Sequence, residues 1–375
     1  MNEEIFLDAN AHTPLNPKAL EKYIKFNKTL AAHGHPSSPS IPGRAASTAI
    51  EESREKIAQL IGAQRASQII FTSSCTQACE WAAEIFFHAN NRKNSNVLFS
   101  NIEHPAMRDA INKNYMSTII NPDNQLKKIN LNKDASLDYD NLENYDKICW
   151  INLQNEIGNI YNLKKLKNKC KILLSDMSQS LGKIPVNVTE SDVDIAVFGA
   201  HKFGGFGNLG FIYLKDNSLW KPFGTGSRYF MDRPGTMDVG TIVASTVALE
   251  DAIDSLPQRT ENMISFKETL ELGFRDLGYL IMGEGAERSP NTTFIKMNNS
   301  NALYLIKYLG DHLIHVGLGS ACGSFHTGES PLMKNLGITG GSNDFVRFSQ
   351  WGQYSKKHAK RILSVINNFH NSIKN

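Results

Sequence analysis

The first two thirds of the chain alternate short apolar, β-branched runs with longer polar or amphipathic stretches. Several of these stretches are long enough for a crossover helix, and the alternation predicts a doubly wound α/β fold built on a mostly parallel sheet. The run 209–214 follows its predecessor after only a short glycine-rich loop, so we expect it to pair antiparallel. The five preceding runs expected to form strands are 68–72, 96–100, 148–153, 171–175 and 193–198.

The pattern changes after about residue 244, where longer helical repeats such as 264–277 and 356–369 dominate. We therefore expect two domains. The large domain spans 15–244. The smaller, α+β domain combines 1–14 with 245–375.

Composition narrows the class of protein. The 375 residues are 41% hydrophobic and 21% charged, and 40 basic and 37 acidic residues are spread along the chain without a basic face that would favour nucleic acid. The start, Met1 to Glu4, lacks a basic leader with an apolar run, and nothing approaches the roughly 20 apolar residues of a membrane span. A cytoplasmic protein without a membrane partner is expected. The Asn-, Lys- and Asp-rich stretch 121–147 is expected to be an exposed excursion.

Five cysteines, an odd number without a Cys-x-x-Cys pair, argue against a disulfide framework and against a zinc knuckle. In a reducing compartment a single cysteine is available as a reagent. Cys75 and Cys79 are four residues apart with no histidine nearby, and His33 and His35 lie in a Gly/Pro-rich loop. We expect structural packing and a loop role for these pairs, and no metal site.

Polar residues follow three of the predicted strands, and ligands of open α/β sheets bind at such strand ends. Ser74 and Thr76 stand where a strand runs into a helix, so they either cradle a phosphate or only cap the helix. Asp176 ends an apolar run, where it either meets a cofactor or caps a turn. Lys202 lies among glycines that let a planar cofactor approach, which suits a partly desolvated Schiff-base lysine.

These segments belong to a series of short motifs that continues over almost the whole chain: Leu7 to Leu15, His35 to Pro39 with Gly43-Arg44, Glu103-His104, Asn155 to Gly158, Asp176 with Gln179, His201-Lys202, Arg233 to Thr236, Gly319 to Cys322, and Val346 to Ser349. In this order they resemble the cysteine desulfurases and selenocysteine lyases of the class-V aminotransferase family. The resemblance implies an enzyme of fold type I that depends on pyridoxal 5'-phosphate (PLP), with a mostly parallel seven-stranded sheet in its large domain.

The resemblance also implies roles around the cofactor. Lys202 would hold PLP as a Schiff base and then move protons. Asp176 would pair with the pyridine nitrogen and keep it protonated, and Gln179 would bond the ring hydroxyl oxygen. His104 would stack on the ring and shuttle a proton. The phosphate would be bound by Ser74, Thr76 and His201, with Thr236 reaching over from the neighbouring subunit of a homodimer.

Substrate and sulfur chemistry would fall to another group of residues. Asn155 and Arg347, with Asn10, would hold the carboxylate of L-cysteine, because the planar arginine fork bonds a carboxylate in two places. Cys322, in a small and flexible segment, would attack the substrate sulfur as a thiolate, leaving alanine and a persulfide. The length of the segment from Cys322 to Arg347 resembles that of the desulfurase class in which the cysteine lies on a mobile loop and transfers sulfur to an acceptor protein.

Some positions depart from the usual family pattern. Gly199 and Ala200 stand where Ser-Gly is common, and Cys75 stands where a small residue is typical. His12 replaces a usual threonine, and the run Gln350 to Gly352 replaces a shorter one.

Other functions stay open at this level. A selenocysteine lyase would share every residue named above. A catalytically weakened homologue could serve as a scaffold in a sulfur-transfer complex, and an ordinary transaminase or β-lyase is disfavoured by the surroundings of Cys322. The destination of the sulfur, whether iron–sulfur clusters, thiolated RNA or modified DNA, is not fixed by the sequence.

Overall fold

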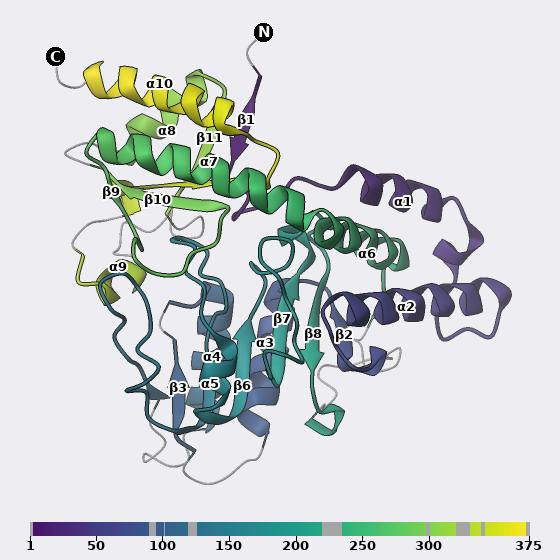
Figure 1. Cartoon of the computed structure of the whole chain (residues 1–375). Coiled ribbons are helices and arrows are strands. Elements are labelled where there is room, and N and C mark those ends of the chain that lie inside the picture. The colour runs from purple at the N-terminus through teal and green to yellow at the C-terminus, as the bar shows by residue number, and fades with distance from the viewer. Residues whose placement is uncertain are drawn as a thin grey trace.

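Two β-sheets organise the chain (Figure 1). The computed structural model describes residues 3–89, 95–100, 102–118, 126–219, 235–297, 301–319, 331–338 and 342–372. A seven-stranded sheet lies in the larger, lower part of the view, and a five-stranded sheet lies above it among the last helices of the chain.

The large sheet has the strand order β2-β8-β7-β6-β5-β3-β4. All neighbouring pairs are parallel except those of β8, which runs antiparallel to both β2 and β7. The predicted α/β fold and the antiparallel pairing of the run 209–214 are confirmed. The strands are β2 (Ile69–Thr72), β3 (Val97–Phe99), β4 (Leu126–Lys127), β5 (Tyr145–Cys149), β6 (Cys170–Asp176), β7 (Ile195–Gly199) and β8 (Gly210–Leu214).

Helices cover both faces of this sheet, so its strands are apolar on both sides. Strand β7 shows the alternation: Ala196 and Phe198 join one hydrophobic cluster, and Ile195 and Val197 join the other. The helices of this part are α1 (Pro17–Asn27), α2 (Ile41–Leu60), α3 (Cys75–His88), α4 (Pro105–Thr118), α5 (Leu163–Lys167) and α6 (Val239–Asp254), with short 3-10 turns η1 (Leu30–His33), η2 (Ala66–Gln68), η3 (Ala200–Lys202) and η4 (Asn217–Leu219).

The second sheet joins the two ends of the chain. Its order is β1-β11-β12-β10-β9, and β1 pairs in parallel with β11. The domain limits at residues 14 and 244 stay a prediction; residue 244 falls inside α6. The elements of this part are β1 (Ile5–Leu7), α7 (Leu256–Asp276), β9 (Leu280–Ile281), β10 (Thr292–Lys296), α8 (Ala302–Asp311), β11 (Ile314–Leu318), α9 (Pro331–Asn335), η5 (Ser342–Asp344), β12 (Phe345–Ser349) and α10 (Lys356–Ser372).

The stretch 121–147 was expected to be exposed, and for much of its described part this prediction was wrong. Its apolar residues Leu131, Ala135 and Leu137 are at most 8% exposed and belong to the core. The Tyr161 hydroxyl donates to the Ala135 carbonyl at 2.7 Å. A segment that is polar on average can therefore still be anchored by a few apolar side chains.

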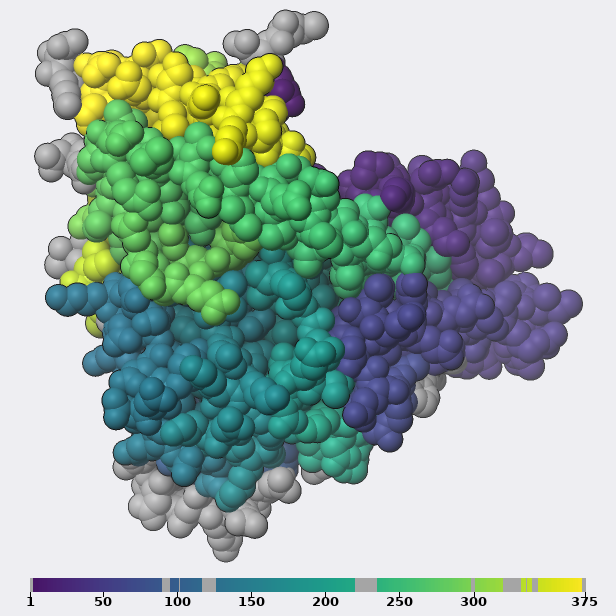
Figure 2. All heavy atoms as spheres, in the orientation of Figure 1, coloured from purple at the N-terminus to yellow at the C-terminus, as the bar shows by residue number. Residues whose placement is uncertain are grey.

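The outer surface is uneven. In Figure 2, α1 and the first part of α2 project to one side of the body. Within the described ranges, no helix is both long enough and apolar enough to cross a bilayer.

Candidate active site

A cavity with about 500 Å³ of empty space opens at one edge of the large sheet. Its walls come from segments that follow β2, β3, β5, β6 and β7, which all run in the same direction, so their carboxyl ends meet at this edge. Most residues expected from the sequence to bind cofactor or substrate therefore come together. The lining residues are Cys75, Thr76, His104, Ala106, Ile151, Asn155, Asp176, Ser178, Gln179, His201 and Lys202.

Lys202 ends the turn η3 and is held by the N-terminal segment. Its Nζ donates to the carbonyl oxygens of Asn10 and Ala11, both at 2.8 Å. Thr13 secures the same segment, because its hydroxyl donates to the Lys202 carbonyl at 2.8 Å. Gly204 follows with a φ of +87°, a conformation that glycine adopts without strain. Lys202, which lines the cavity, is thus held in place by residues far away in the sequence.

Asp176 is the last residue of β6 and is only 4% exposed. One of its carboxylate oxygens accepts the backbone N–H of Ser178 at 2.9 Å, so the following turn is fixed against it. Beside it lies a second buried acid, Glu103, whose pKa is raised well above its usual range by burial and then by the charge of Asp176. Burial therefore disfavours the charged form of Glu103, and of these two acids it is Asp176 that lines the cavity.

Three imidazoles surround the lysine. Burial lowers the pKa of His201 to about 3 and also lowers the pKa of His104. His104 accepts the Ala106 N–H at its Nδ1 over 3.2 Å, so the neutral ring carries its proton on Nε2. The ring of His201 stacks on His12, with centroids 5.6 Å apart. Burial and the charge of Lys202 lower the pKa of His12 as well.

The cavity wall formed by α3 contains the predicted phosphate ligands. Ser74 caps the helix, its hydroxyl accepting the Gln77 N–H at 3.1 Å, and Thr76 lines the cavity. The Sγ atom of Cys75 lies 3.0 Å from the Ser178 hydroxyl. Across the cavity wall, a Cβ added to Gly199 would come within 2.8 Å of the Cys75 Cβ. Cysteine 75 thus fills the space that a serine at position 199 would need.

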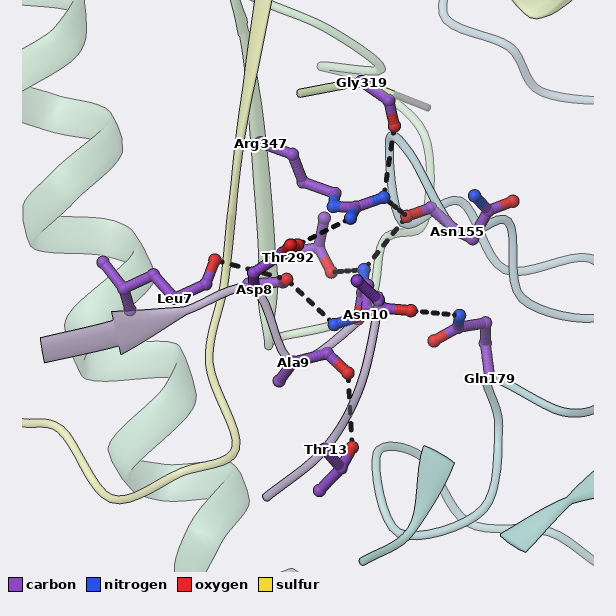
Figure 3. Close-up of polar contacts among 12 residues, drawn as sticks. Leu7, Asp8, Ala9, Asn10, Thr13, Asn155, Gln179, Thr292, Gly319 and Arg347 are labelled. Atoms are coloured by element: carbon purple, nitrogen blue, oxygen red, sulfur yellow. Dashed lines mark hydrogen bonds and ion pairs between the residues drawn. The ribbon is translucent and has the colours of Figure 1, made fainter. Parts of the chain in front are cut away.

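The residues predicted to bind substrate form a buried network (Figure 3). Arg347, in β12, donates through Nη2 to Asp8 at 2.7 Å and through Nη1 to the carbonyls of Asn155 and Gly319, both at 3.1 Å. Its Nε is buried without a hydrogen-bond partner among the described residues. The arginine therefore keeps a donor for a further acceptor beside Asn155, which lines the cavity.

Asn10 sits at the centre of the same network and is 4% exposed. Its side-chain nitrogen donates to the Thr292 hydroxyl at 2.8 Å and to the Asn155 carbonyl at 3.1 Å, while its side-chain oxygen accepts from Asn291 at 2.9 Å. Its backbone carbonyl accepts from Gln179 at 2.9 Å as well as from Lys202. In this arrangement Asn10 holds other site residues in place; contact with substrate stays a prediction for it.

Thr236 is not among the residues that line this cavity. Cys322 falls outside the described residues; Gly319, three positions earlier, lies against Arg347. Thr236 is exposed and precedes the α6 N-cap Asp238 by two positions.

Sequence reasoning did not find Asp8 or Lys183, although both are in contact with predicted site residues. Asp8 pairs with Arg347 across 339 positions of the chain, and Lys183 donates to the side-chain oxygen of Gln179. Asp8 lies inside a motif quoted for the family, but its partner is set by the tertiary fold.

Comparison with known proteins identifies the family. The model of the class-V aminotransferases matches residues 5–359. A cysteine desulfurase IscS of Dictyoglomus turgidum is 30% identical over 357 residues, which cover 90% of this chain and 87% of the relative. The chain belongs to the cysteine desulfurase family of class-V aminotransferases.

Two solved structures share the fold of this chain. A NifS-like protein superposes with a TM-score of 0.85 at 22% identity, covering 98% of this chain and 99% of the other. A second structure, SspA in complex with cysteine, has a TM-score of 0.75 at 19% identity and covers 94% of this chain and 100% of the other. The expected fold type I architecture is thereby confirmed for this family member.

The residues present fit PLP. A pyridine nitrogen needs a negative partner, and Asp176 is a buried carboxylate on the cavity wall. A phosphate needs donors, and the cavity offers the N-terminus of α3 with Thr76. His201 lines the cavity too, and its Nδ1 is buried without a hydrogen-bond partner among the described residues. Such an atom is one that a ligand can complete.

Proposed function

We propose that this protein is a PLP-dependent cysteine desulfurase that converts L-cysteine to L-alanine and carries the sulfur as a persulfide on Cys322. The observation that carries the proposal is the single cavity around which Lys202, Asp176 and His104 meet, in a chain whose relatives are cysteine desulfurases. One structural neighbour was solved with cysteine, which supports L-cysteine as the substrate class.

Bound PLP would supply an electron sink that makes the substrate α-carbon acidic and weakens the bond to sulfur. Asp176 would hold its pyridine nitrogen, Gln179 its ring hydroxyl oxygen and Lys202 its aldehyde carbon. Thr76 and His201, with Ser74, would hold the phosphate.

Proton movement would rest on Lys202 and His104. The Lys202 amine is hydrogen-bonded to two backbone carbonyls, so it must leave Asn10 and Ala11 to reach a substrate carbon. Burial lowers the pKa of His104 and its Nδ1 accepts the Ala106 N–H, so the neutral ring has an Nε2–H that can donate its proton. These two groups suit removal and return of the protons that alanine formation requires.

Substrate would be oriented by its carboxylate. Arg347 is 1% exposed, keeps its Nε free of partners in the described chain, and lies beside Asn155. Asp8 offsets its charge while the site awaits substrate. We assign the carboxylate of L-cysteine to Arg347 and Asn155, with Asn10 behind them.

Sulfur transfer would take place on Cys322. Its thiolate attacks the substrate sulfur, an S–S bond forms, and the C–S bond breaks with its electron pair left on carbon. That carbon takes up a proton and becomes the methyl group of alanine, so one thiol and one cysteine give one persulfide and one alanine. An acceptor protein in the cytoplasm would then collect the sulfur.

We also propose that the chain forms a homodimer in which Thr236 reaches the phosphate of the neighbouring site. Apolar side chains on the projecting helices support this. Leu20 and Ile24 of α1 and Leu30 of η1 are 43%, 47% and 73% exposed, and Ile41 at the start of α2 is 76% exposed. Exposed apolar side chains gathered on neighbouring elements mark interaction surfaces.

Intact-mass analysis tests the main proposal. Purified protein is incubated with PLP and L-cysteine, and we expect one added sulfur atom, mapped by peptide analysis to Cys322, together with release of alanine. C322A should lose the added sulfur, while C170A, at a half-buried cysteine away from the cavity, should keep it. Release of selenium from selenocysteine with no reaction on cysteine would favour a selenocysteine lyase, and protein that binds no PLP would favour a scaffold.

A further inference from the structure

Lys183 is a fully buried lysine in the turn that follows β6. Its side chain is 0% exposed, and its Nζ donates to the side-chain oxygen of Gln179. Burial lowers the pKa of Lys183 well below its usual range, and the charges of Lys202, Arg347 and Arg259 lower it further. The charge of Asp8 raises the pKa of Lys183, but Asp8 is paired with Arg347. No carboxylate among the described residues lies within ion-pair distance of the Lys183 amine. A salt bridge therefore does not explain why a lysine occupies this place.

The hydrogen bonds to Asn10 and from Lys183 fix the orientation of the Gln179 side-chain amide. A backbone carbonyl only accepts hydrogen bonds, so the atom that meets the Asn10 carbonyl at 2.9 Å must be the amide nitrogen. Lys183 donates in either protonation state, so the atom that faces it must be the amide oxygen. Figure 3 shows the Asn10 end of this arrangement.

The same amide lines the cavity, next to the lysine expected to carry the cofactor. The Asn10 carbonyl joins the two groups, since it accepts from both Gln179 and Lys202. If Lys183 were apolar, the Gln179 oxygen would be a buried acceptor without its donor, and of these two contacts only the one with the Asn10 carbonyl would still orient the amide. The amide nitrogen would then be held less firmly on the cavity side.

We propose that Lys183 is a positioning residue for cofactor binding: it holds the Gln179 amide with its nitrogen available to the ring hydroxyl oxygen of PLP. The inference rests on the proposed function. Lys183 itself lies outside the cavity wall and acts through Gln179.

Titration of the cofactor-free protein with PLP tests this role. We expect K183M to weaken PLP binding by about 5- to 50-fold, the effect of losing one buried hydrogen-bond arrangement, and to shift the visible absorbance of bound PLP and its pH dependence. K183R keeps a donor and should retain most of the affinity. As a matched control, K147M removes another buried lysine, which donates to the Phe86 and Phe87 carbonyls at the end of α3, and should leave PLP binding unchanged.

The same titration in a Q179A background separates positioning from general stability. If Lys183 acts through Gln179, adding K183M to Q179A should change PLP affinity by less than about twofold. The proposal would be overturned if K183M weakened PLP binding equally in the wild-type and Q179A backgrounds. It would also be overturned if K183M alone left the PLP affinity and the absorbance spectrum unchanged. K183A, which also lacks a donor, serves in the same cycle if K183M does not fold, with the same two outcomes. Wild-type protein that binds no PLP would instead overturn the proposed function together with this inference.

Discussion

At the residue scale, two departures from the family pattern, Gly199 and Cys75, are explained by their contact with each other. Serine at position 199 is excluded by Cys75, because a Cβ there would lie 2.8 Å from the Cys75 Cβ and 3.2 Å from its Sγ. The sulfur lies 3.0 Å from the Ser178 hydroxyl, so it also fills a polar position in the cavity wall. From the sequence alone the two changes were unconnected, because nothing in it places residue 75 against residue 199.

This packing predicts a coupled response to mutation. G199S should destabilise the cofactor-free protein by about 1–3 kcal/mol through overpacking. Adding C75A should recover part of that loss, since it removes the sulfur at 3.2 Å from the new Cβ and keeps the Cys75 Cβ at 2.8 Å. Thermal unfolding of the four combinations measures the coupling. Additive effects of the two substitutions would contradict the account.

Much of the candidate site is predictable residue by residue, and the reason is topological. Thr76, Asp176 and Lys202 all follow strands in the sequence, and strands of like direction bring such residues to one edge. The partners that hold these groups are not predictable in this way. Asp8 meets Arg347, and Lys183 meets Gln179, only because the folded chain puts them together. Their roles, like those of all the site residues, stay predictions until tested.

At the element scale, the run Gln350 to Gly352 links the two sheets. Trp351 follows β12, the strand of Arg347, and packs on Gly182 in the turn of Gln179 and Lys183. Gly182 has a φ of +73°, and a Cβ there would come within 2.6 Å of the Trp351 ring. In the sequence, this run departs from the usual family pattern, which has a shorter run here. Its contact could not be foreseen, because it joins the strand of Arg347 to the turn of Gln179 and Lys183, which come from separate parts of the chain.

The projecting elements α1, η1 and α2 lead to a second prediction. The double variant I24E/L30E should shift the protein from dimer to monomer, because burying two carboxylates in an apolar interface is costly. Sedimentation velocity measures the change. L272E, at an exposed leucine of α7 that is 58% exposed, is the control and should leave the dimer intact. Wild-type protein that sediments as a monomer would contradict the proposed dimer.

At the scale of the whole molecule, buried neutral histidines make stability depend on pH. The pKa of His201 is lowered by burial to about 3, below the ordinary 6.5 of an unfolded chain. Above pH 6.5 neither state binds this proton. Between pH 6.5 and pH 3 the unfolded state binds it and the folded state does not, so stability falls as the pH falls.

Cofactor-free protein should therefore lose stability between pH 7 and pH 5, and His201 should account for about 1–2 kcal/mol of that loss. H201Q removes the titrating group, so its stability should fall less steeply over the same range. Urea unfolding at several pH values measures both slopes. Parallel slopes for the two proteins would show that His201 titrates normally in the folded state.

The overall architecture was largely foreseeable because the strands of the large sheet are buried on both faces and therefore read as continuous apolar runs. The upper sheet was harder to see. Strand β9 has two residues, and β1 has three and pairs with a partner from the last quarter of the chain. The excursion at 121–147 was misjudged for a related reason: its few apolar anchors are diluted by polar neighbours.

The pairing of β1 with β11 has a consequence for synthesis. Ile5 lies opposite Ile314, so β1 gains this neighbour only after the intervening chain up to Ile314 has been synthesised. The segment just after β1 supplies the carbonyls that hold Lys202. A partly made chain that lacks β11 would therefore have Lys202 before the β1 segment that orients its amine is anchored in the upper sheet.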